Sequence, residues 1–349
     1  MTPIRALVVD DSAAIRAVLT RILSVDPEIE VVGQAPEPNT ARQMIKDLEP
    51  DVITLDVEMP GMDGLSFLER IMRLRPMPVV MCSTLTAHGA AVTIEALRLG
   101  AVDCIAKPKG SAEELARNGA LLRATVKAAA RSAVRPSRSA RPPVVATTTG
   151  KAREDAVIAI GSSTGGVEAL FALLGAMPVD CPPILIVQHM PGAFTGSFAD
   201  RLDRECRIHV QEARDGMTLA MGNAYIAPGG EQHMELVGAA GSSIRVRPGE
   251  LTSGHRPSVD VLFRSVATRR GPAAVGAILT GMGSDGAEGL LAMRRAGART
   301  FGQSRESCVV YGMPRAAMEL GAVDKEMTLS AMPEAILAAC GMRQARVGA

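Results

Sequence analysis

The sequence predicts an α/β protein made of two doubly wound domains, each with helices on both faces of a parallel β-sheet. Three observations support this. The 349 residues are enough for two cores. Short, wholly apolar runs, typical of strands covered on both faces, alternate with helical periodicity in both halves. A stretch rich in arginine, proline, serine and threonine separates the halves. We therefore expect a domain over 1–130, a linker over 131–153 and a second domain over 154–345.

The first domain repeats a strand–helix pattern five times. The apolar run 6–9 predicts the first strand, and apolar residues at helical spacing over 15–23 predict the helix after it. Further strands are predicted at 31–32, 51–55, 79–82 and 102–105, each separated by a helical segment. This pattern predicts a five-stranded open parallel sheet, in which ligands gather at the carboxyl ends of the strands.

Polar residues stand at those carboxyl ends. Asp10 and Asp11 close the first strand, Asp56 the third, Ser83 the fourth and Lys107 the fifth. Three converging carboxylates repel one another and raise their pKa values unless a divalent cation is bound, and Mg²⁺ prefers such oxygen ligands. Acidic residues also end strands simply because turns are polar. Five such placements at one edge favour a site over that simpler explanation.

Four motifs give this domain its resemblance to a response-regulator receiver domain: VVDDS (8–12), TLDVEMPGMDG (54–64), VVMCS (79–83) and AKP (106–108). The resemblance implies that Asp56 accepts a phosphoryl group from a histidine kinase. It further implies that Asp10, Asp11, Asp56 and the backbone carbonyl of Glu58 bind Mg²⁺, and that Ser83 and Lys107 contact the phosphoryl oxygens. Cys104 stands where many receivers have an aromatic residue, so we expect signalling here without an aromatic switch.

Composition excludes several classes of function. The formal net charge of +1 creates no field that would attract nucleic acid or an acidic membrane, and there is no tryptophan for base stacking. No apolar run approaches the roughly 20 residues of a membrane span, and we expect no signal peptide because the first residues predict a strand. The six cysteines show no zinc or redox spacing and are expected to be buried thiols. We expect a cytoplasmic monomer that neither binds nucleic acid nor inserts into membranes.

The stretch 131–153 carries six basic residues and no acid, among prolines, serines and threonines. Such a tract could contact nucleic acid, but it lacks aromatic residues and length. We interpret it as an extended, solvated linker.

The second domain opens on an apolar strand at 156–160 that stops at a glycine-rich turn, Gly161–Gly166, before a helix begins. A turn of this kind presents backbone N–H groups at the positive end of a helix dipole. It could bind a phosphate, or it could present a serine nucleophile beside oxyanion donors. Ser163 occupies the nucleophile position of a G-x-S-x-G pattern. The turn alone does not decide between these two functions.

Two further strand ends carry groups that complete a catalytic set. His189 follows the apolar run 183–187, and Asp285 follows the strand predicted at 274–280. An acid that opens a helix is ordinarily a cap, and His255 is a rival for the role of base. His209 and His233 lie in strand-like segments and are expected to be structural. Short alternating runs over 208–247 suggest a β-hairpin insertion.

Serine, histidine and aspartate at neighbouring strand ends suit acyl transfer, because histidine takes the serine proton and aspartate orients the histidine. The order Ser…His…Asp differs from that of α/β-hydrolases, so the pattern does not place the chain in that fold.

Five motifs make the whole chain resemble the chemotaxis protein-glutamate methylesterase (CheB) family: IGSSTGG (160–166), VQHMP (187–191), HRPSVDVLF (255–263), ILTGMGSDGA (278–287) and SCVVYGMP (307–314). The resemblance makes Ser163 the nucleophile, His189 the base and Asp285 its orienter. It gives Met282 an oxyanion amide and places Thr164 beside the triad.

The resemblance also implies a function: hydrolysis of glutamate methyl esters, and deamidation of glutamines, on methyl-accepting chemotaxis receptors. Hydrolysis needs no cofactor. The receiver is expected to cover the site until Asp56 is phosphorylated in the presence of Mg²⁺. The alternative is a response regulator whose second domain only binds a phosphate or nucleotide through the turn Gly161–Gly166.

Overall fold

The computed structural model describes residues 2–59, 64–84, 86–107, 112–132, 148–149 and 151–344. Most of the predicted linker, 133–147 and 150, lies outside the described residues, as do 60–63, 108–111 and the predicted end of the second domain at 345. The chain divides into two compact units, Met1–Ser139 and Ala140–Ala349. No helix of the described residues is long and apolar enough to cross a membrane.

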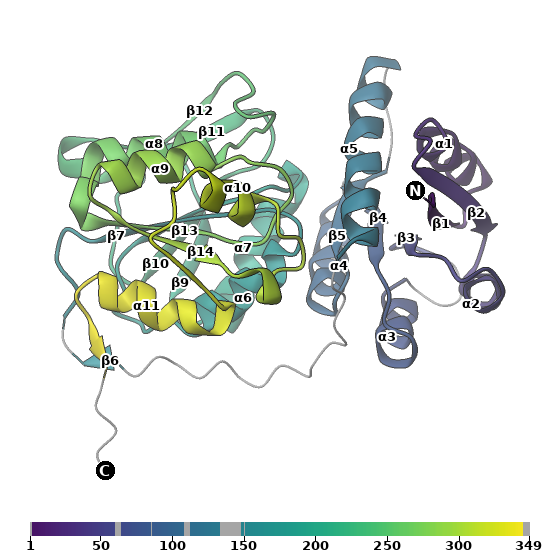
Figure 1. Ribbon diagram of the computed structural model, residues 1–349, viewed down its shortest axis with the longest axis horizontal. Helices are drawn as coiled ribbons and strands as arrows, with labels where there is room; N and C mark the ends of the chain where they lie inside the picture. Colours follow the sequence, from purple (N-terminus) through teal and green to yellow (C-terminus); the bar gives the residue numbers. More distant parts are fainter. Residues whose placement is uncertain are drawn as a thin grey trace, which may run out of the picture. The chain divides into compact units, whose positions relative to one another are not determined.

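The first unit contains one five-stranded sheet in the order β2-β1-β3-β4-β5, with every neighbouring pair parallel (Figure 1). This confirms the predicted fold of the domain. The strands are β1 (Ile4–Val9), β2 (Ile29–Ala35), β3 (Val52–Asp56), β4 (Val79–Ser83) and β5 (Asp103–Ala106). The helices are α1 (Ala13–Leu23), α2 (Pro38–Leu48), α3 (Gly64–Leu74), α4 (Ala87–Arg98) and α5 (Ala112–Ala130).

The second unit is built on a larger sheet whose seven strands are also all parallel, in the order β15-β14-β13-β7-β8-β10-β9. The strands are β7 (Val157–Ser162), β8 (Ile184–Gln188), β9 (His209–Glu212), β10 (Asn223–Ile226), β13 (Ala274–Ile278), β14 (Arg299–Gln303) and β15 (Lys325–Met327). A small antiparallel sheet, separate from the large one, joins β6 (Thr148–Thr149) to β16 (Arg343–Gln344), near the two ends of the unit.

The predicted hairpin insertion at 208–247 is only partly right. Strands β9 and β10 run parallel to β8 and complete the main sheet. Only β11 (Gln232–Val237) and β12 (Ser243–Pro248) form an antiparallel hairpin. Short alternating runs predict strands but not their partners, because pairing is decided by contacts between distant segments.

Helices cover both faces of the larger sheet (Figure 1). One face packs against α8 (Val259–Arg270), α9 (Ala287–Arg295), α10 (Met313–Glu319) and the hairpin, through a core that includes Phe263, Leu290 and Met313. The other face carries α6 (Gly166–Gly175), α7 (Gly192–Glu205) and α11 (Met332–Ala339). Single turns of 3-10 helix occur at Ala239–Gly241, Gly271–Ala273, Arg305–Ser307 and Leu329–Ala331.

Candidate active site

The three predicted catalytic residues follow three adjacent strands, in the order β13-β7-β8. Ser163 comes directly after β7, His189 directly after β8, and Asp285 in the loop between β13 and α9. The chain leaves β7 toward β8 on one side and returns to β13 on the other. The site therefore lies at the point where the strand order reverses, which is where parallel α/β sheets gather ligands.

The glycine turn after β7 is held by backbone contacts. The Ser163 amide donates to the Thr280 carbonyl at 3.0 Å, and Gly165, with φ of +76°, caps α6. Only Glu49 and Ser253 among the described non-glycine residues have positive φ. Ser163 is half-buried and does not sit on a left-handed elbow.

Gln188, which the sequence analysis did not single out, connects the serine turn to the histidine. Its side chain is 2% exposed, and its Oε1 accepts from the Ser162 hydroxyl at 2.7 Å. Its Nε2 donates to the carbonyls of Ser163 and His189, at 2.9 and 3.0 Å. One buried amide therefore holds the main chain of both predicted catalytic residues. Its position before His189 at a strand end was the only sequence signal.

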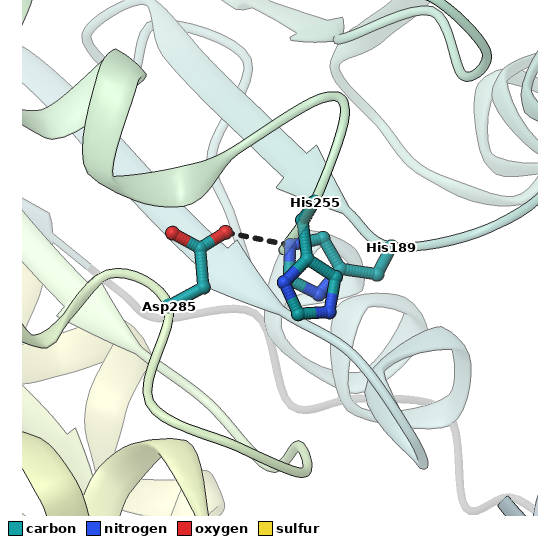
Figure 2. A group of neighbouring side chains, drawn as sticks. All are labelled: His189, His255 and Asp285. Carbon is teal, nitrogen blue, oxygen red and sulfur yellow. Dashed lines mark hydrogen bonds and ion pairs between the residues drawn. The ribbon is translucent and has the colours of Figure 1, made fainter. Parts of the chain in front are cut away.

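His189 bonds to Asp285 through an unexpected ring nitrogen. Its Nε2 lies 2.9 Å from Oδ2 of Asp285, as Figure 2 shows. In the usual serine-protease arrangement it is Nδ1 that bonds to the aspartate. Here Nδ1 is buried and has no hydrogen-bond partner among the described residues. Nδ1 is therefore the nitrogen left available for a serine hydroxyl.

Asp285 acts as a cap, but on a different helix from the one it precedes. The N-cap of α9 is Gly286. The Asp285 carboxylate instead accepts from the first residues of α8: the Val259 amide at 2.8 Å, the Asp260 amide at 3.0 Å and the Ser258 hydroxyl at 2.7 Å. Burial raises the pKa of Asp285. The hydrogen bond and charge of His189, together with the hydrogen bonds from Ser258 and Asp260, lower it by more, so the pKa lies below its ordinary value.

Among the described residues, His255 makes no hydrogen bond to Asp285. Its ring is stacked on the His189 ring, with centroids 3.9 Å apart and planes 5° apart. Its Nδ1 donates to the Ser253 carbonyl at 2.8 Å. Burial, followed by the neighbouring charge of His189, lowers the pKa of His255. The Asp285 carboxylate, which is predicted to orient the base, is therefore paired with His189.

The two histidines expected to be structural lie in strands. His209, in β9, pairs with Asp203 at 2.7 Å on the exposed surface. His233, in β11, is buried, with Nε2 donating to the Glu250 carbonyl at 2.8 Å and Nδ1 accepting from the Ser258 amide at 3.1 Å. His233 thus supports the residue whose hydroxyl binds Asp285.

The predicted oxyanion segment runs beside Ser163. A β-carbon on Gly281 would lie 2.8 Å from the Ser163 β-carbon, so the chain just before Met282 is closely packed against it. Thr164 is 3% exposed, and its carbonyl accepts from the Thr280 hydroxyl at 3.0 Å. These contacts put both predicted near-site residues next to the serine turn.

In the first unit, the predicted phosphorylation site comes together at one sheet edge. Carboxylate oxygens of Asp10, Asp11 and Asp56 lie within 4.8 Å of one another. Lys107 bridges two of them, with Nζ 2.8 Å from Asp10 and 2.7 Å from Asp56. Burial, together with the neighbouring charge of Asp10, raises the pKa of Asp56, and Lys107 offsets this only in part. Clustered hard oxygen donors of this kind fit Mg²⁺.

Of the remaining predicted residues, Glu58 lies against Asp56, whereas the Ser83 hydroxyl bonds elsewhere. The Glu58 amide donates to Asp56 Oδ1 at 3.2 Å, which places the Glu58 backbone against the carboxylate. Ser83 ends β4, is fully buried and donates to the Thr84 carbonyl at 3.1 Å. Cys104 is buried in β5, and all six cysteines are free thiols, of which only Cys206 is not fully buried.

Comparison with known families gives two matches. The CheB methylesterase family model matches residues 158–336, and the response regulator receiver domain model matches residues 6–117. A protein-glutamate methylesterase/protein-glutamine glutaminase of Caulobacter vibrioides is 56% identical over 97% of this chain and 98% of that protein. One from Bordetella parapertussis is 50% identical over 99% and 100%.

Among solved structures, the crystal structure of the Thermotoga maritima CheB methylesterase catalytic domain is similar to the second unit. It is 34% identical, with a TM-score of 0.51, and the match covers 54% of this chain and 99% of that one.

Proposed function

The chain belongs to the CheB methylesterase family, and from this membership we propose that it is a phosphorylation-activated serine hydrolase acting on methyl-accepting chemotaxis receptors. It would hydrolyse glutamate methyl esters and, as the names of its relatives suggest, deamidate glutamines. The observation that carries the proposal is the His189–Asp285 pair, 2.9 Å apart, beside the serine turn. We assign this activity to 154–345, with 1–130 as receiver and 131–153 as linker.

In the proposed reaction, the Ser163 hydroxyl attacks the γ-carbonyl of the glutamate methyl ester. His189 takes the serine proton at Nδ1, the nitrogen not engaged by Asp285. The tetrahedral intermediate collapses, its C–O bond to methoxide breaks, and His189 returns the proton so that methanol leaves. Water then hydrolyses the acyl-serine with the same base, which regenerates Ser163 and a glutamate carboxylate.

Two environments assist this chemistry. The ionised Asp285 stabilises the imidazolium that forms on His189, and the amides at the start of α8 keep that carboxylate charged. A backbone amide of Met282 is proposed to donate to the developing oxyanion. For a glutamine substrate the same steps release ammonia in place of methanol.

The first unit is proposed to regulate the second. Asp56 would accept a phosphoryl group from a chemotaxis histidine kinase, with Ser83 and Lys107 binding its oxygens. Asp10, Asp11, Asp56 and the Glu58 carbonyl would hold Mg²⁺, which neutralises phosphoryl charge when bound. Receptors and kinase are reached in the cytoplasm, and the protein is proposed to act there as a monomer.

The alternative, a module that only binds phosphate or nucleotide through Gly161–Gly166, is not favoured. A binding loop needs no His189–Asp285 pair, and it needs no buried amide holding the carbonyls of Ser163 and His189.

The test separates the two functions. The purified full-length protein is treated with a phosphodonor and assayed for methanol release from methylated receptors, and it is labelled with a fluorophosphonate serine probe. A hydrolase releases methanol and is labelled at Ser163. A protein that does neither is a binding module, and the proposed function fails.

A further inference from the structure

His255 lies in the active site without an established task. It comes from the loop between β12 and α8, and its ring is nearly parallel to the ring of His189, 3.9 Å away between centroids (Figure 2). We propose that His255 is a positioning residue, whose flat ring keeps the His189 ring in the one orientation that has Nε2 on Asp285 and Nδ1 free for the serine. The inference rests on the proposed function, because it assigns a role within that reaction.

The His255 ring is itself fixed in place. Its Nδ1 donates to the Ser253 carbonyl at 2.8 Å, and its backbone exchanges two hydrogen bonds with Thr252, at 2.9 and 3.2 Å. The Ser253 hydroxyl in turn donates to Asp260 in α8 at 2.7 Å. The turn 252–255 is thus tied to the helix behind it. A ring held this way can restrain its neighbour.

The same loop also holds the other partner of His189. Three residues further along, Ser258 and the first amides of α8 donate to the Asp285 carboxylate. The segment 252–260 therefore fixes the carboxylate by hydrogen bonds and reaches the imidazole by stacking. Both members of the dyad are oriented by one continuous stretch of chain.

Stacking matters because only one orientation of the His189 ring keeps both nitrogens in place. A half-turn of the imidazole about its Cβ–Cγ bond, through an edge-on orientation, would put the Cε1 carbon where Nε2 bonds to Asp285 and the Cδ2 carbon where Nδ1 lies. The rings are already at the optimal carbon–carbon separation of roughly 3.5–4.0 Å, so an edge-on ring would collide with His255. The stack therefore blocks the rotation that would take Nε2 away from Asp285 and Nδ1 away from the serine.

Two other roles for His255 fit the contacts less well. As a base it would lack a carboxylate partner, since the Asp285 oxygens already accept from Ser258, Val259, Asp260 and His189. His189, His255 and Asp285 are also close enough to suggest a metal site. A metal ion lies in the plane of each imidazole that binds it, and two parallel planes cannot share one ion. The role that fits the contacts of His255 is therefore the packing of its ring against the ring of His189.

Two substitutions separate the ring from its hydrogen bond. His255→Phe keeps a flat ring but loses the bond to Ser253, whereas His255→Asn keeps a donor for Ser253 but loses the ring. His209→Asn, on the exposed surface of β9, controls for removal of a histidine. Each is made in the full-length protein, activated by a phosphodonor, and assayed for kcat and KM of methanol release with methylated receptors.

We expect His255→Phe to keep kcat within about threefold, and His255→Asn to lose about 10- to 100-fold in kcat with KM unchanged, as for a misplaced catalytic group. Fluorophosphonate labelling should slow in parallel. Equal losses in the Phe and Asn variants would mean that His255 acts through its proton or its bond. Normal turnover in both would mean that the stack does nothing.

A second measurement does not depend on esterase activity. In nitrogen-15 spectra of the histidine rings, His189 should show one protonated nitrogen in the wild type and in His255→Phe, and a mixture of the two tautomers in His255→Asn, where the bond to Asp285 no longer fixes the proton. A single tautomer in all three proteins would overturn the inference. If the wild type gave this pattern but released no methanol, the positioning role would stand and the proposed function would fail.

Discussion

A β-carbon on Gly166 would lie 2.1 Å from Oε1 of Gln188. Position 166 can therefore hold only glycine while Gln188 keeps its place, and the reason is close packing, because its φ is not positive. Gln188 needs that place to reach the carbonyls of Ser163 and His189. The second glycine of the pair that ends the turn thus makes room for the amide that connects Ser163 to His189.

We predict that Gly166→Ala destabilises the protein by about 1–3 kcal/mol, the usual cost of overpacking, and lowers turnover because Gln188 must move. The matched control is Gly196→Ala in α7, where a β-carbon would meet only Glu212 at 3.7 Å. That variant should gain roughly 0.5–1 kcal/mol. Urea unfolding and methanol release measure both effects. Similar stability of the two variants would contradict the packing argument.

The two neighbouring serines should behave differently. Ser163→Ala is expected to abolish methanol release and probe labelling, since it removes the proposed nucleophile. Ser162→Ala should keep most of the turnover but lose about 1–3 kcal/mol of stability, because it leaves the buried Oε1 of Gln188 without its 2.7 Å donor. Chemical unfolding of both variants checks this. Near-normal activity of Ser163→Ala would remove it from the mechanism.

Asp285→Asn should lower turnover by up to about 10⁴-fold. An amide has one acceptor oxygen, whereas the Asp285 carboxylate accepts from four donors, so the asparagine must present its NH₂ group to some of them. Asp203→Asn, which breaks the exposed His209–Asp203 pair, is the control and should turn over normally. A loss below tenfold for Asp285→Asn would mean that the pair is not catalytic.

The pKa of Asp285 also predicts a pH dependence. Because it is held below the ordinary 3.8, the carboxylate stays charged throughout the neutral range. Its contribution to stability is full above that ordinary value and is lost only as pH falls through the lowered pKa. The difference between the unfolding free energies of the wild type and Asp285→Asn should therefore still be present at about pH 5 and disappear only below pH 3.8. A difference already lost at about pH 5 would contradict the assignment.

Much of the fold and of the site's composition was predictable because it follows from local pattern. Apolar runs with polar ends predicted the parallel strands of the first sheet. The same pattern predicted that Ser163 and His189 follow strands, and they come directly after β7 and β8. Which strand β9 would pair with was not predictable, because an alternating run fits a hairpin and a parallel edge equally well.

Atomic roles were less predictable than residue identities. Nothing in the sequence distinguishes Nδ1 from Nε2 of His189, since the choice depends on where α8 places its first amides. The local sequence predicts that Asp285 caps α9. That it caps α8 instead depends on packing between helices that are distant in sequence. The stack of His255 on His189 likewise depends on a loop from another part of the chain.

Gating by the receiver predicts a difference between fragment and full chain. The composition of 131–153 is that of a tether, so we expect inhibition to require direct contact between the units rather than a fixed linker geometry. The fragment from Lys151 onward should demethylate receptors faster than the unphosphorylated full-length protein. Asp56→Ala should keep basal activity but not respond to acetyl phosphate. A fragment no faster than the full chain would rule out occlusion.

The order of strands in the larger sheet bears on how the polypeptide is made. Strand β7 gains one neighbour, β8, soon after it is synthesised, but its other neighbour, β13, begins only at residue 274. Until then one edge of a strand that is wholly buried in the folded protein has no partner, and such edges invite pairing with other chains. The same delay keeps Asp285 from reaching His189. A nascent chain thus contains Ser163 and His189 long before the His189–Asp285 pair can form.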